Sequence, residues 1–118
     1  MDTSELPESV RARIAERSAL PAVDKVRALL HGYVADAETF SEIRDELAST
    51  ARTNTVFLRQ YLAALETILT EPQPAGTLLR LVESDGNWGI DHDQTDAGAA
   101  EFFRRLADML REVIGEVE

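Results

Sequence analysis

Apolar residues recur at three- and four-residue intervals along most of the chain, a pattern typical of helices that bury one face. The pattern predicts helical segments at residues 7–17, 21–34, 39–70 and 96–117. In the third segment Thr39 and Glu42 form a capping box, which satisfies exposed N–H groups at a helix start. We therefore expect a mainly α-helical protein, with about four to five helices in an antiparallel bundle, folded as a single domain over residues 1–118.

The segment from 39 to 70 leaves two interpretations open. Its apolar repeat is continuous, so one helix of about 31 residues, roughly 46 Å long, could run through it. Thr50 and Asn54, however, place polar side chains in the middle of the repeat. A break or kink between Thr50 and Thr55 would use Asn54 as the N-cap of a second helix. The polar gap favours the break slightly.

The stretch between this segment and the last helix also has two interpretations. Two prolines in residues 71–76 end the preceding helix, because proline cannot continue it. Asp85 and Gly86 form a dipeptide that suits a type I′ turn, so a short hairpin or extended segment is predicted over about 77–91, before the last helix. The competing interpretation is a short helix from Gly76 to Ser84, because its leucines and valine also fit one helical face.

Charge narrows the classes of partner. The 118 residues carry a net charge of −10 and no cysteine, which excludes disulfides and thiolate chemistry. Residues 71–118 have 11 acidic and 4 basic side chains, a net of −7, whereas residues 1–70 have 11 and 8, a net of −3. Such an excess opposes binding to nucleic acid or to an anionic membrane. A basic protein is the partner that this charge favours, with a metal ion as the alternative.

The first residues and the lengths of the apolar runs indicate where in the cell the protein is located. No apolar run approaches the length of about 18 residues that indicates a membrane span. The first residues are acidic, whereas a signal peptide begins with basic residues followed by apolar ones. We therefore expect a cytoplasmic protein that does not contact a membrane.

Residues 81–96, which we call the tryptophan segment, are the best candidate for a binding site. They hold the only tryptophan of the chain and one of its two histidines, beside several carboxylates. Aromatic side chains often supply interface energy, and charge sets association rate and selectivity. Trp88 is expected either in the core or as a partly exposed anchor, and one edge could serve each role. The candidate partner-binding residues are Glu83, Asp85, Trp88, Asp91, His92, Asp93 and Asp96.

The residue types and spacing of the same segment also bear on metal binding and catalysis. Counting an EF-hand loop from Asp85 or from Asp91 puts wrong residues at positions 6 and 12. An irregular metal site at Asp91, His92, Asp93 and Asp96 remains an alternative, although turn and cap roles account for the same residues. His92 is the only candidate for acid–base work, and no motif for nucleophilic catalysis or for a cofactor occurs. We expect neither enzyme activity nor a cofactor.

In size, acidity, absence of cysteine and helical pattern, the chain resembles the small all-α immunity proteins that bacteria make against their own toxins, of colicin type or in contact-dependent inhibition. The resemblance implies a non-enzymatic antitoxin-type protein that binds a basic toxin domain and blocks its active site. The resemblance assigns a role to no residue, because no family motif is present. A hairpin before the last helix would also depart from a simple four-helix bundle.

A second hypothesis is a regulatory helical module that dimerises through one of its apolar stripes. The candidate stripes are Leu58, Leu62, Leu65 and Leu69, and Phe102, Leu106 and Leu110. The sequence leaves open whether the two stripes close on each other or on a second copy. It also leaves open the identity of the partner and the surface used.

Overall fold

The computed structural model describes residues 21–90 and 93–118, so the helix predicted at 7–17 lies outside the described residues. The described chain is mainly α-helical and contains no strand. Its elements are α2 (Ala22–Leu29), the π-helical turn η2 (Leu30–Val34), α3 (Phe40–Thr53), α4 (Val56–Thr70), α5 (Thr77–Arg80), the π-helical turn η3 (Leu81–Asp85) and α6 (Asp96–Val117).

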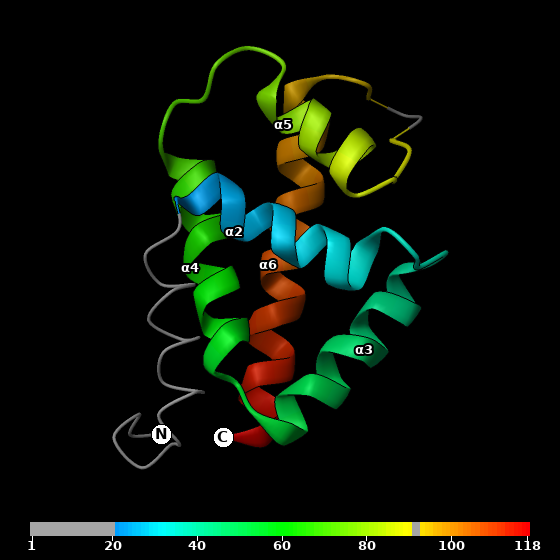
Figure 1. Ribbon diagram of the computed structural model, residues 1–118, viewed down its shortest axis with the longest axis vertical. Helices are drawn as coiled ribbons and strands as arrows, with labels where there is room; N and C mark the ends of the chain where they lie inside the picture. Colours follow the sequence, from blue (N-terminus) through cyan, green and yellow to red (C-terminus); the bar gives the residue numbers. More distant parts are fainter. Residues whose placement is uncertain (1–20, 91–92) are drawn as a thin grey trace.

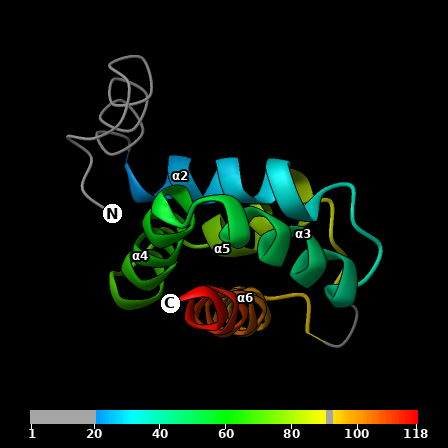
Figure 2. The same ribbon diagram turned by 90° about the horizontal axis from the view of Figure 1, so that it is seen from below.

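Helix α6 packs against three of the other helices. It contacts α3, α4 and α5, and α2 in turn packs on α4. Figure 1 shows α4 and α6 running in opposite directions, with α2 crossing them. In Figure 2, α2 and α6 lie on opposite sides of the molecule with α3, α4 and α5 between them. The expectation of an all-α bundle is confirmed.

Both apolar stripes are used inside this bundle. Leu58 and Leu65 of α4 are fully buried. Leu106 and Leu110 of α6 are also fully buried. Leu62 and Leu69, at the edge of the first stripe, are partly buried against the same core. Val117 is the one exposed large hydrophobic residue in the described part of the chain, with 42% of its surface accessible. The two stripes therefore close mainly on each other.

The break predicted within residues 39–70 is confirmed. Helix α3 ends at Thr53 and α4 begins at Val56. Asn54 is extended, and its Oδ1 accepts the N–H of Val56 at 2.7 Å, although the N-cap position itself belongs to Thr55. The capping box of Thr39 and Glu42 is present at the start of α3.

The predicted hairpin is wrong, and the competing helical interpretation holds. Residues 77–85 form α5 and η3, with Leu81 and Val82 buried, and η3 ends with the Gly86 N–H donating to the Leu81 carbonyl at 2.9 Å. A type I′ turn needs positive φ at both central residues, but Gly86 has φ −87°. Within the described part of residues 77–91, only residues 86–90 are non-helical.

Gly86 is required for a different reason. A Cβ at this position would lie 2.7 Å from the Val82 carbonyl oxygen and 3.3 Å from Leu30 Cδ2. The glycine therefore permits the close approach of η2 and η3, which contact each other. The left-handed residue that ends the helix is Asn87, with φ 48°.

Candidate functional site

Asp85, the first acidic candidate of the tryptophan segment, joins two helices. Its Oδ1 lies 3.1 Å from His31 Nε2 and its Oδ2 lies 3.5 Å from Arg27 Nε, and its side chain is 22% exposed. Nearby, Asn87 donates to the carbonyl of Ala35 at 3.3 Å. These contacts tie η3 to α2 and η2, so the charge of Asp85 is largely used within the protein.

Asp96 has a structural role as well. Its carboxylate accepts the N–H of Gly76 at 2.7 Å and the N–H of Leu79 at 3.0 Å. These two hydrogen bonds, Gly76 first, hold the pKa of Asp96 below its usual value of 3.8, against a smaller opposing effect of burial. Asp96 is thus the cap of α5, supplied from the first residue of α6. The start of α6 itself is capped by Thr95, whose hydroxyl accepts the Gly98 N–H at 3.3 Å.

The remaining candidates have varied environments. Asp93 is partly buried and accepts a hydrogen bond from the Thr95 hydroxyl. Glu83 is exposed and forms no ion pair within the described residues. Asp91 and His92 lie outside the described residues. Within residues 21–90 and 93–118, no three His, Asp or Glu side chains are grouped so that they could hold a metal ion.

Trp88 combines the two roles that the sequence predicts. Its ring packs against Phe40 and Phe102, with centroid distances of 5.2 and 5.7 Å, and the two phenyl rings are themselves 5.6 Å apart. Such edge and tilted contacts stabilise aromatic clusters. Trp88 is nevertheless only partly buried. It covers the core with one side and leaves another side accessible.

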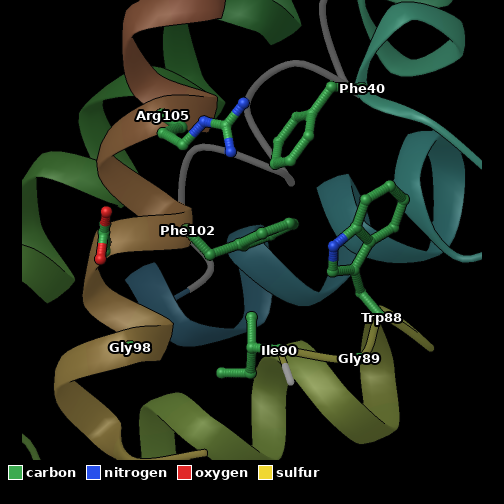
Figure 3. A pocket seen from close by; sticks show the side chains of 8 residues that line it. Phe40, Trp88, Gly89, Ile90, Gly98, Phe102 and Arg105 are labelled. Atoms are coloured by element: carbon green, nitrogen blue, oxygen red, sulfur yellow. The ribbon is translucent and has the colours of Figure 1, made fainter. Parts of the chain in front are cut away.

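Trp88 also lines a pocket of about 230 Å³, which we call the aromatic pocket. Figure 3 shows its side chains converging from the start of α3, from the non-helical stretch after η3 and from α6. None of the described acidic candidates lines it. Its lining residues are Phe40, Trp88, Gly89, Ile90, Gly98, Glu101, Phe102 and Arg105.

Glycine at position 98 is needed where this pocket meets the chain before α6. A Cβ there would overlap the carbonyl oxygen of Asp93 and lie 2.9 Å from the Asp93 Cβ. The missing side chain lets residues 93–95 cross the first turn of α6.

A second hollow, which the sequence did not predict as a site, lies between η2 and α3. This acidic groove has a volume of about 480 Å³. Three of its four carboxylates, those of Asp36, Asp45 and Glu46, are exposed and form no ion pair in the described part of the chain. The fourth, Glu42, belongs to the capping box. The groove is lined by Gly32, Tyr33, Asp36, Ala37, Glu42, Asp45 and Glu46.

The acidic groove left a weak signal in the sequence. Glu42 is followed by Asp45 and Glu46 at three- and four-residue spacing, which places all three carboxylates on one face of a helix. Asp36 joins them only because the chain turns between η2 and α3, so its contribution required the tertiary structure. The pattern resembles an ordinary solvated helix face, and the larger excess of acidic residues lies in residues 71–118.

Comparison with known proteins gives no relative from which a site could be transferred: no family model, curated protein or solved structure matches the chain. None of the described helices is both long enough and apolar enough to cross a membrane.

Proposed function

We propose that the protein is a non-enzymatic binding protein of immunity or antitoxin type, which neutralises a basic partner, such as a toxin domain, in the bacterial cytoplasm. The observation that carries this proposal is the set of exposed carboxylates at the acidic groove that form no ion pair within residues 21–90 and 93–118. Carboxylates that are already bonded within the fold attract a partner less than free ones do. Asp36, Asp45 and Glu46 have no such bonds among the described residues.

The groove suits a cationic side chain better than a flat acidic surface does. Tyr33 contributes an aromatic ring to the lining, and its hydroxyl lies 3.0 Å from Thr50 Oγ1, which fixes the ring in place. Arginine and lysine bind favourably over aromatic faces, and arginine also pairs with carboxylates through two N–H groups. A loop or helix rich in arginine could therefore place one side chain in the groove while its neighbours meet the surrounding charge.

The net charge of −10 supports the same proposal at longer range. Opposite charge accelerates the encounter of two proteins and suppresses binding to acidic competitors. In the tryptophan segment, Glu83 is exposed and Asp93 partly buried. We propose that they and the accessible side of Trp88 add to the contact surface, with the acidic groove as its main electrostatic element.

Purification of the tagged protein from its native host tests this proposal. We expect a cationic protein to co-purify at low salt and to be released as salt rises, because screening weakens exposed charge pairs. Co-expression should then suppress the toxicity of that partner. Recovery of only self-associated protein, or of a partner whose toxicity is unaffected, would refute the immunity proposal.

A matched pair of variants locates the surface. Asp36→Asn, Asp45→Asn and Glu46→Gln together remove three charges from the acidic groove. Glu71→Gln, Asp108→Asn and Glu112→Gln remove three exposed charges elsewhere. The groove variant should associate with the recovered partner about tenfold more slowly at low salt, because electrostatic steering can change association rates by that much or more. Equal association rates for the two variants would show that the groove is not the surface.

A further inference from the structure

The aromatic pocket contains two hydrogen-bond donors for which no described residue is an acceptor. The first is the guanidinium of Arg105, whose Cζ lies 3.9 Å from the centroid of the Phe40 ring. Arg105 forms no ion pair in the described part of the chain, although the protein has an excess of acidic residues. A guanidinium stacked on a ring keeps its N–H groups at the edge, where they can bind an anion bidentately.

The second donor is the indole N–H of Trp88. No described residue accepts a hydrogen bond from it. It is also not sealed in the core, because the described residues contain no buried side-chain nitrogen or oxygen without a partner. Figure 3 shows the nitrogen edge of the indole turned toward Phe102 and the interior of the pocket. Buried or half-buried indole N–H groups usually have an acceptor, so this one is available to a ligand.

Apolar groups form part of the wall between the two donors. Phe40, Phe102 and Ile90 supply ring and aliphatic surface, while Gly89 and Gly98 carry no side chain into the space. A volume of about 230 Å³ lies below the range of roughly 300–1,000 Å³ that is usual for drug-sized ligands. The pocket therefore fits a ligand of one or two rings.

We propose that the aromatic pocket binds a small aromatic carboxylate. Its ring would pack against Phe102 and Ile90, its carboxylate would accept from Arg105, and the Trp88 N–H would offer a second donor to an oxygen of the ligand. Glu101 also lines the pocket, but it is exposed and already engaged in a contact of its own. This inference does not depend on the proposed binding of a basic partner, which concerns the acidic groove.

Trp88 makes the test direct, because it is the only tryptophan and its fluorescence reports on the pocket. The probe is 3-phenylpropionate, which does not absorb where tryptophan is excited, and its neutral control is 3-phenylpropionamide. We expect a saturable change in Trp88 emission with 3-phenylpropionate, with a dissociation constant of about 0.1–1 mM for a ligand of this size. The amide should bind several-fold more weakly.

Three variants test the role of charge. Arg105→Gln should weaken binding of 3-phenylpropionate about tenfold, as expected for loss of a charge-assisted hydrogen bond. Arg104→Gln is the matched control, since Arg104 is the exposed neighbour on α6 that does not line the pocket, and it should leave binding unchanged. Glu101→Gln should strengthen binding a few-fold by removing a like charge. Circular dichroism checks that each variant is folded.

Any of the following outcomes would overturn the proposal. Absence of a saturable change in the wild-type protein means that the pocket does not take this class of ligand. Equal binding of the acid and the amide, or of the wild type and Arg105→Gln, means that no anion is recognised. Equal weakening by Arg104→Gln and Arg105→Gln means that net charge alone controls the interaction.

Discussion

The tryptophan segment and residues 36–46 contain the same number of acidic residues but differ in how these charges are used. Each stretch holds five acidic residues. In the tryptophan segment, Asp85 pairs with Arg27 and His31, and Asp96 caps α5. In residues 36–46, three carboxylates at the acidic groove have no partner among the described residues. The density of charge along a sequence therefore does not indicate how much of it a partner can reach.

The difference has a geometric cause. The tryptophan segment includes η3 and connects α5 to α6, and its side chains must satisfy backbone groups at turns and helix starts. Short aspartate side chains serve that purpose well. The carboxylates at the groove that lie on α3 belong to an ordinary helical turn, whose backbone groups are bonded within the helix. Only Glu42, at the first turn, is drawn into a cap.

The largest expected effect concerns Trp88. Trp88→Ala should reduce the free energy of unfolding by about 2–4 kcal/mol, because the ring packs on Phe40 and Phe102 but is only partly buried. Chemical denaturation followed by circular dichroism measures the change. Val117→Ala, at the exposed hydrophobic position, should alter stability by less than about 0.5 kcal/mol. A loss no larger than that of the control would mean that the tryptophan segment is not anchored by its ring.

Asp96→Ala should cost about 1–2 kcal/mol at neutral pH, the usual range for loss of a helix cap. Because the pKa of Asp96 is lower in the folded than in the unfolded chain, its contribution is present above the ordinary carboxyl pKa and is lost as pH falls through the folded value. The wild type and the variant should therefore converge in stability in acid. A constant difference between them across the acid range would contradict the ionised cap.

Asp85→Asn should have a smaller effect, below about 1 kcal/mol, because its partners Arg27 and His31 are about half exposed or more and such pairs are weak. A double-mutant cycle with Arg27→Gln measures the coupling, which we expect at about 0.2–1 kcal/mol. Zero coupling would show that Asp85 does not interact with Arg27. The charge of Asp85 would then be available to a partner.

The smallest effect on folding is expected at the acidic groove. The triple change of Asp36, Asp45 and Glu46 to their amides should leave the unfolding free energy within about 0.5 kcal/mol, or raise it slightly, because unpaired like charges repel. Thermal and chemical denaturation both test this. A loss of unfolding free energy above about 1 kcal/mol would mean that these carboxylates stabilise the fold and are not free to bind a partner.

The sequence predicted the features that depend on local pattern. The stripes on α4 and α6, the capping box at Thr39 and the break near Asn54 are all decided by residues a few positions apart. The prediction of a hairpin is wrong because Asp85 and Gly86 also fit the end of a helix. Glycine is needed at position 86 because Leu30 and Val82 lie close to it, and not because of a turn.

The site was harder to predict because its chemistry is built from distant residues. Asp96 caps a helix that begins 19 residues earlier in the chain. The aromatic pocket needs Phe40 beside Trp88 and Arg105, which no local pattern places together. The prediction that Trp88 is both a core and a surface residue, in contrast, follows from the size and the amphipathic ring of this side chain.

Nuclear magnetic resonance with a hexa-arginine peptide tests the central claim most directly. In low salt, backbone amide shifts of the labelled protein should change around residues 32–46, and the changes should vanish near 500 mM salt, where screening extends over only a few ångströms. The triple amide variant should lose the response while the control lacking the charges of Glu71, Asp108 and Glu112 keeps it. Shifts centred on residues 83–96, or spread evenly over the acidic surface, would contradict the assignment of the acidic groove as the surface for a basic partner.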